Sequence, residues 1–184
     1  MKFESHPMLL VQRMRKIYGE DLVLTFSRYR YFPQSLVDIR ESFCLRSSEV
    51  TELWLESALG SLEPGLELAF HSNVVTPSGV MHIPMVDFAT KGRAQLDKLR
   101  NFLGSEVAGE MVWFDSGRSF HGYGLKLIPD RDWTAFMGRL LLSNQPNVPP
   151  LIDPRWVGHR LIAGYSALRW SGNTDHYLHV PRLI

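Results

Sequence analysis

Residues 116–124 contain the side chains whose types and spacing are best suited to chemistry. A polar turn that includes Gly117 leads into an alternating strand. Side chains repeat every second residue in a strand, so Ser119, His121 and Tyr123 should point to one face. A hydroxyl and an imidazole beside such a turn can hold a phosphate group. Taken in isolation, His121 is more typical of a buried, hydrogen-bonded strand histidine, and the serine and the turn beside it favour a functional role.

Two aspartates follow apolar runs elsewhere in the chain. Asp87 comes after residues 83–86, and Asp153 comes after Leu151 and Ile152. Carboxylates at strand ends suit hard cations such as Mg²⁺ or Mn²⁺, which prefer oxygen ligands. Two carboxylates holding a metal, with a histidine and an arginine beside them, can bind and polarise a nucleoside triphosphate. The alternatives are a turn cap for Asp87 and a helix N-cap for Asp153.

The elements that must position these residues differ between the two parts of the chain. For residues 1–60 the pattern predicts a mostly helical extension, which would pack on the sheet or dock a protein partner. Its expected helices cover residues 6–18, 33–43 and about 48–60, with a short strand over residues 21–26.

From residue 61 the pattern predicts one compact unit, residues 61–184. Strands are expected at 66–75, 80–88, 111–114, 119–128, 161–170 and 177–180, and helices at 92–103, at 133–142 and from Pro154. This order predicts an α+β fold with a mainly antiparallel sheet and helices packed on one face.

Composition limits the class of protein. The chain has 184 residues, of which 45% are hydrophobic and 21% are charged, as is typical of a globular domain. No apolar run reaches the roughly 20 residues of a membrane helix, so no membrane partner is expected. The N-terminus lacks the layout of a secretory signal and Cys44 is the single cysteine, which favours the cytoplasm. The net charge of +1 argues against strong non-specific nucleic-acid binding.

The sequence resembles the archaeo-eukaryotic primase superfamily of primases and primase-polymerases, and in particular its compact bacterial members in defence or mobile-element settings. Ser119-Phe120-His121 matches the Ser-x-His motif of that family, and Ile152-Asp153 matches its motif of an apolar residue followed by Asp. Residues 168–174 are similar to the arginine and turn that follow. The similarity covers about residues 65–180 and implies an RRM-like sheet as the catalytic core.

The resemblance also implies roles for individual residues. Asp87 and Asp153 would bind Mg²⁺ or Mn²⁺, and His121 would contact nucleotide phosphates with help from Ser119 and Arg118. Arg169, or else Arg160, would hold phosphate or template.

One departure concerns the first metal motif of the family, an apolar strand that ends in Asp-x-Asp. The residue two before Asp87 is Met85, and the residue two after it is Ala89. Either Asp115 or a glutamate from elsewhere replaces the missing carboxylate, or the domain binds nucleotide without efficient polymerisation.

Three functions follow from these observations. The first is a primase-like, metal-dependent nucleotidyltransferase acting on nucleotides and a DNA or RNA template. The second is a weakened primase-fold module that binds nucleotide or nucleic acid, or serves as an interaction subunit of a larger assembly. The third is a metal-dependent phosphoesterase.

Residues 28–32 interleave arginines with aromatics, which is typical of single-strand binding surfaces and equally of a half-buried strand.

Overall fold

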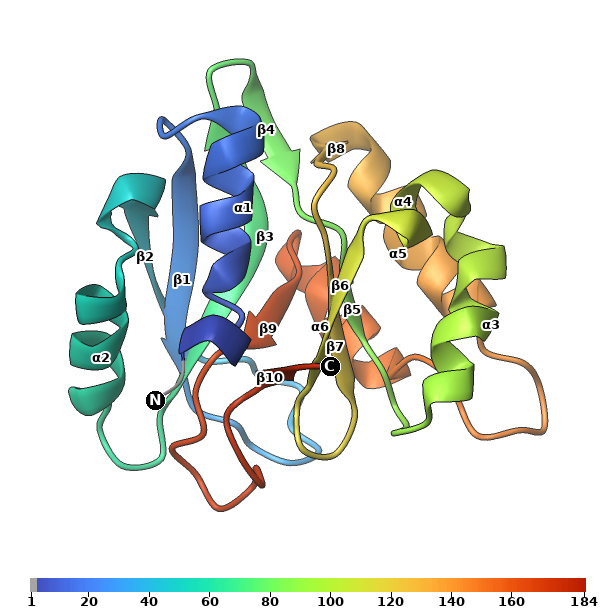
Figure 1. Ribbon diagram of the computed structural model, residues 1–184. Helices are drawn as coiled ribbons and strands as arrows, with labels where there is room; N and C mark the ends of the chain where they lie inside the picture. Colours follow the sequence, from blue (N-terminus) through green and yellow to red (C-terminus); the bar gives the residue numbers. More distant parts are fainter. Residues whose placement is uncertain (1–2) are drawn as a thin grey trace.

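Two antiparallel sheets form the centre of the part of the chain that the structure describes (Figure 1). The computed structural model describes residues 3–184, apart from the side chains of residues 3, 93, 105 and 106. The first sheet has the order β2 (Arg40–Arg46), β1 (Val23–Tyr29), β3 (Glu67–Thr76), β4 (Gly79–His82) and β8 (Ile128–Pro129), with β9 (Ala167–Arg169) also pairing with β3. The second has the order β10 (Arg182–Leu183), β6 (Met111–Asp115), β7 (Phe120–Gly124) and β5 (Met85–Asp87).

Helices cover both sheets and divide the hydrophobic core into two main clusters. The helices are α1 (Leu9–Tyr18), α2 (Glu52–Gly60), α3 (Arg93–Leu103), α4 (Ser105–Gly109), α5 (Asp130–Leu142) and α6 (Pro154–Ala163), with short 3₁₀ turns at Phe3–Ser5 and Ser47–Glu49. The helix α1 lies across the first sheet, and α3, α4 and α5 gather beside the second (Figure 1).

An aromatic cluster fixes the first sheet against the chain after β9. Phe26 of β1 and Phe70 of β3 lie 5.0 Å apart between ring centroids, and Trp170 lies 4.7 Å from Phe70 and 5.3 Å from Phe26. All three side chains are fully buried. Contacts of this kind add roughly 0.5–1.5 kcal/mol per pair beyond the burial of apolar area. They therefore hold β9, and the residues that flank it, in a defined position.

The expected helix over residues 33–43 is wrong. Residues 40–46 form β2, which pairs with β1 along its whole length, from Val23 opposite Arg46 to Tyr29 opposite Arg40. Phe43 of β2 stacks on Phe26 of β1 at 5.9 Å. The cross-strand packing overrides the local pattern, because strand preference depends on such partners more than on the chain itself.

Three expected strands also have different bounds. The strand expected over 161–170 is α6 up to Ala163 and then the short β9, and the C-terminal strand is Arg182–Leu183 rather than 177–180. The strand that carries His121 ends at Gly124 rather than at residue 128. The left-handed Gly164 ends α6, which explains why the apolar run there is split between a helix and a strand.

The predicted α+β fold class with mainly antiparallel sheets is confirmed, since every strand pair among residues 3–184 is antiparallel. The division of the chain at residue 61 stays a prediction. The first 60 residues supply α1 and α2, and they also supply β1 and β2 of the first sheet. Over the described residues, no helix combines the length and the apolar character needed to cross a membrane.

Candidate functional site

The pairing of β5 with β7 places Asp87 directly opposite His121. The Nε2 atom of His121 lies 3.7 Å from Oδ1 of Asp87, and the Ser119 hydroxyl lies 3.5 Å from the same oxygen. Next to His121, a Cβ atom at Gly122 would lie 2.3 Å from the Trp113 ring. A glycine is therefore required where Trp113 of β6 packs across β7. The three polar groups expected near one another from the sequence do lie together.

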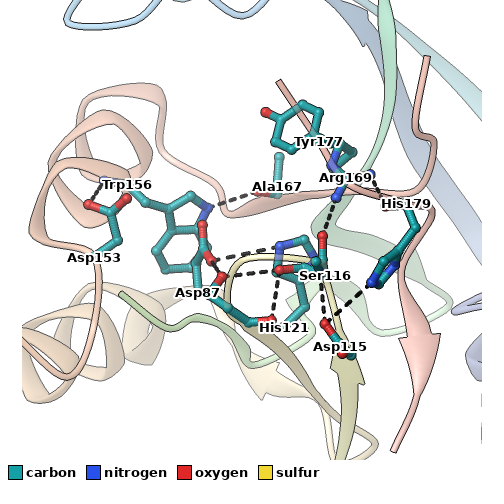
Figure 2. A network of polar contacts seen from close by, with 12 residues as sticks. Asp87, Asp115, Ser116, His121, Asp153, Trp156, Ala167, Arg169, Tyr177 and His179 are labelled. Carbon is teal, nitrogen blue, oxygen red and sulfur yellow. Dashed lines mark hydrogen bonds and ion pairs between the residues drawn. The ribbon is translucent and has the colours of Figure 1, made fainter. Parts of the chain in front are cut away.

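Asp153 joins this group through the backbone. Phe88 and Ile152 form an isolated antiparallel bridge, and the Asp153 N–H donates to the Asp87 carbonyl at 3.0 Å. The Asp153 side chain also caps α6, because its Oδ1 accepts from the backbone N–H groups of Arg155 and Trp156. The N-cap interpretation of Asp153 is therefore correct, and it is compatible with a place in the site. Figure 2 shows the Asp153 carboxylate turned toward the first turn of α6 and that of Asp87 turned toward His121.

Asp87, His121 and Asp153 all line one cavity of about 380 Å³. Arg160 and Arg169, which the sequence also singled out, line the same cavity. Positive charge prevails there, because the described lining residues include five arginines and three aspartates. The arginines are Arg30, Arg40, Arg155, Arg160 and Arg169, and the aspartates are Asp38, Asp87 and Asp153. A cavity of this size and charge suits a small phosphorylated ligand.

Burial controls the protonation of the two central groups. Burial and the nearby charge of Asp153 raise the pKa of Asp87 to about 8, although Arg169 and the Ser119 hydrogen bond act in the opposite direction. Burial and the charge of Arg169 lower the pKa of His121 well below its ordinary value. The imidazole is therefore neutral near pH 7. Its Nδ1 is buried and has no hydrogen-bond partner anywhere in residues 3–184.

Arg169 is held rigidly at the edge of the cavity. Its Nη2 donates to the Ser116 carbonyl at 2.6 Å, and its Nη1 donates to the carbonyls of Ser171 and His179. The guanidinium carbon lies 3.8 Å from the centroid of the Tyr177 ring. Figure 2 shows the two side chains next to each other. These contacts leave Nε without a partner within the described part of the chain. Arg169 thus supplies fixed positive charge together with one free donor.

The segment after Arg169 is positioned by Glu67, a buried residue of β3. Its carboxylate accepts from the Ser171 hydroxyl, from the Asn173 N–H at 2.9 Å and from the Thr174 hydroxyl at 2.7 Å. A buried carboxylate is stable only when it is hydrogen-bonded in this way. Sequence reasoning missed Glu67, because a glutamate inside an alternating strand gives no local signal of three distant partners.

The remaining predicted residues lie outside the cavity. Arg118 is exposed on the turn before β7, and neither it nor Ser119 is among the described residues that line the cavity. Asp115, proposed as a substitute carboxylate, instead pairs with Lys91 at 2.7 Å. Burial would raise the pKa of Asp115, but Lys91 and the Gly117 N–H lower it below its ordinary value. The Asp115 carboxylate is thus held at the turn by Lys91 and the Gly117 N–H.

A segment that the sequence analysis did not assign to the site forms much of the cavity wall. Residues between Tyr29 and Arg40 contribute nine of its lining residues. Arg155 and Trp156 of α6 line it as well, and the Trp156 indole donates to the Ala167 carbonyl at 2.9 Å. The alternation of arginines and aromatics at residues 28–32 was the one signal that could have identified this wall.

The donor set allows a test of whether a divalent cation fits. Across the described residues, no group of three or more histidines, cysteines or acidic residues is placed to hold a metal ion. Asp87 and Asp153 are nevertheless close enough for the charge of one to raise the pKa of the other. Mg²⁺ commonly binds through one or two carboxylates and completes its shell with water and substrate phosphates. Asp87 and Asp153 supply carboxylates of that kind to one cavity, whereas Met85 is buried in the core and offers no ligand.

Comparisons with known proteins concern the family and the fold. The sequence model of a family described as archaeo-eukaryotic primase 1D-like matches residues 46–182. The chain is also similar to a crystal structure of the catalytic domain of primase Repb′ in complex with initiator DNA. That similarity has a TM-score of 0.52 and an identity of 11%, and it covers 95% of this chain and 82% of the other. At this identity the similarity establishes the fold. No curated protein sequence matches the chain.

Proposed function

Because the chain belongs to the archaeo-eukaryotic primase 1D-like family, we propose that it is a metal-dependent nucleotidyltransferase that acts on nucleotides and a nucleic-acid template. The observation that supports this most is the convergence of Asp87, His121 and Asp153 on one arginine-rich cavity. The fold is that of a primase catalytic domain whose structure holds initiator DNA, which supports nucleic acid as a partner.

Each residue has a defined role in this proposal. Asp87 and Asp153 would hold Mg²⁺ or Mn²⁺, which when bound offsets negative charge on the phosphates. The neutral imidazole of His121 would donate a hydrogen bond to a phosphate oxygen, and Ser119 would orient the Asp87 carboxylate. Arg169 would supply fixed positive charge beside them. Arg118, exposed on the turn, would reach phosphate from outside the cavity.

A second function is favoured by one observation: neither residue two positions from Asp87, the buried Met85 or the exposed Ala89, supplies the second carboxylate of the family motif. With two carboxylates rather than three, the same cavity would bind nucleotide or nucleic acid with little turnover, as part of a larger defence or mobile-element assembly. A protein partner for residues 1–60 and a cytoplasmic location belong to this proposal as predictions.

The deciding experiment measures template-dependent incorporation of a labelled nucleotide with Mg²⁺ or Mn²⁺. The informative variants are Asp153→Asn and His121→Gln. Asparagine is a good N-cap, so the first variant removes the charge while leaving α6 capped. Asp132→Asn is the matched control, since Asp132 is an exposed aspartate in the first turn of α5.

The outcomes separate the candidate functions. Product that depends on template and is lost in both variants, but not in the control, supports the nucleotidyltransferase. Nucleotide binding without product in the wild type supports the binding module. Hydrolysis of nucleotide without template would replace both with a phosphoesterase.

A further inference from the structure

A second group of charged residues lies on the cavity wall, contributed by β2, by the segment before it and by α6. The Asp38 carboxylate accepts from Nε of Arg40 at 2.7 Å, and the same oxygen accepts from Nη2 of Arg160. Burial would raise the pKa of Asp38, but Arg40 and Arg160 keep it below its ordinary value. One carboxylate oxygen therefore serves two guanidinium groups.

This arrangement leaves positive charge without a counter-charge. The Arg160 side chain is only 2% exposed and that of Arg40 is 11% exposed. The Nη1 atom of Arg160 is buried and has no hydrogen-bond partner among the described residues. A buried donor on a charged group that is left unpaired lowers the stability of the protein. Such a cost is typical of a group that is completed by a ligand.

Neighbouring groups do not supply the missing anion. Arg40 lies over the Tyr29 ring, with 4.2 Å between the guanidinium carbon and the centroid, and Arg160 lies 5.7 Å from the centroid of Tyr165. Burial and the charges of Arg40 and Arg160 lower the pKa of His71 to about 3, so this histidine is neutral. Aromatic faces and a neutral imidazole hold the arginines in place without neutralising them.

We propose that Arg40 and Arg160 form a phosphate-binding site for a nucleotide in the cavity, and that Asp38 occupies this site until the nucleotide displaces it. The inference rests on the proposed function, in that the cavity takes a nucleotide. It adds a phosphate site to which residues 38–40 contribute. These residues precede the region matched by the family model, residues 46–182.

The depth of the site favours a nucleotide over the backbone of a strand. Arg160 is almost fully buried, and it lines a cavity of about 380 Å³. A planar guanidinium at such a depth is suited to the end of a small ligand, to which it can donate two hydrogen bonds. The segment that carries Asp38 is also tied to α6 by the Arg155 Nη2 atom, which donates to the Ser35 carbonyl at 3.0 Å. Displacement of Asp38 would therefore loosen this segment rather than release it.

The test compares nucleotide binding by the wild type, Asp38→Asn and Arg160→Gln. Asp38→Asn removes the internal competitor, so we expect affinity for a fluorescent nucleoside triphosphate to rise roughly tenfold, the effect of about 1.4 kcal/mol. Arg160→Gln should weaken binding by roughly tenfold or more. The matched controls are Asp97→Asn and Arg100→Gln, which alter an exposed ion pair on α3 and should change nothing.

Two further ligands test whether the phosphate bound at this site belongs to a nucleotide or to a nucleic-acid strand. A nucleoside without phosphate should bind all variants equally, and a fluorescent single-stranded oligonucleotide should bind Asp38→Asn and wild type equally. Misfolding would not raise the affinity of Asp38→Asn for the nucleoside triphosphate. This variant therefore decides the test even if Arg160→Gln is unstable.

The possible failures are distinguishable. If the wild type binds no nucleotide, both the proposed function and this site are overturned. If the wild type binds nucleotide but Asp38→Asn binds it no more tightly, the phosphate site is overturned and the proposed function stands. A change confined to the oligonucleotide would also overturn the site, because the phosphate would then belong to a strand.

Discussion

Two groups of serine, histidine and aspartate lie in this protein, and they are used in opposite ways. In the sheet cluster, formed by Ser72, His82 and Asp130, the Ser72 hydroxyl lies 2.9 Å from His82 Nδ1, and His82 Nε2 lies 2.9 Å from Asp130. In the cavity cluster, formed by Ser119, His121 and Asp87, the serine and the histidine both approach the aspartate, and the distances are longer. The Ser119 hydroxyl lies 3.5 Å from Oδ1 of Asp87, and His121 Nε2 lies 3.7 Å from the same oxygen.

The tighter cluster is the structural one. Ser72 is fully buried and its hydroxyl also accepts from the Ser166 N–H at 2.8 Å, so it is not accessible to a substrate. Both nitrogens of His82 are paired, and its ring stacks on Trp133. His121 lines the cavity and keeps one buried nitrogen that has no partner among the described residues. Good hydrogen-bond geometry therefore marks a completed network, whereas unused hydrogen-bonding capacity beside a cavity marks a site.

The largest expected difference between the clusters is in activity. Asp87→Asn should lower template-dependent incorporation at least about 100-fold, because it removes one of two carboxylates proposed to bind the cation. Asp130→Asn should stay within about twofold of wild type, since its partner His82 serves the sheet. Incorporation of labelled nucleotide by both variants checks this, and equal activity would remove the functional distinction between the clusters.

For stability we expect the reverse, with the larger effect in the sheet cluster. His82→Ala leaves a cavity under Trp133 and removes one of the two hydrogen-bond partners of the Ser72 hydroxyl, so we expect it to lower the free energy of unfolding by about 3 kcal/mol. His121→Ala should cost about half as much, because its contacts are longer and one nitrogen has no partner to lose among the described residues. Urea unfolding measures both values. A larger loss for His121→Ala would contradict the assignment of the sheet cluster as structural.

Asp87 should make stability fall as the pH rises. Its pKa is about 8 in the folded protein against 3.8 for the ordinary group, so the folded state holds a proton that the unfolded state has released. Between these two values stability decreases with pH, by at most about 1.4 kcal/mol per unit. Asp87→Asn should flatten this slope between pH 6 and pH 8. Urea unfolding at several pH values measures this dependence. If the free energy of unfolding changes equally with pH in the wild type and the variant, Asp87 is not buried beside a like charge.

The smallest effect concerns Asp130 in acid. Burial lowers the pKa of His82 in spite of its hydrogen bond to Asp130, so stability falls as the pH drops below 6.5 and the unfolded histidine takes up a proton. Asp130→Asn removes the charge that, together with the hydrogen bond, raises this pKa, so it should increase the loss of stability between pH 6.5 and pH 5 by less than about 1 kcal/mol. Thermal unfolding between pH 6.5 and pH 5 measures this difference. A variant that is more stable than the wild type in acid would contradict the ion pair between His82 and Asp130.

The residues that meet at the cavity, Asp87, His121 and Asp153, could be singled out from the sequence because their signals are local. An apolar strand that ends at Asp87, the alternation around His121 and an aspartate before Pro154 each occupy only a few residues. The α+β class follows from the same short-range patterns. The helix expected over residues 33–43 failed because Phe43 is positioned by Phe26 across two paired strands, a contact that no local window contains.

Tertiary structure alone decided which polar residues share a cavity and which are saturated by partners. His82 and His121 both lie in strands, and only the position of Ser72, Asp130 and Asp87 separates a completed network from an open one. Arg40 became part of the cavity because β2 pairs with β1 and brings it beside Arg160 of a distant helix. The sequence determined which chemistry was possible, since side-chain types and strand periodicity are properties of the chain. Long-range packing decided where that chemistry is available, because hydrogen-bonding capacity is consumed or left free by residues far apart in the chain.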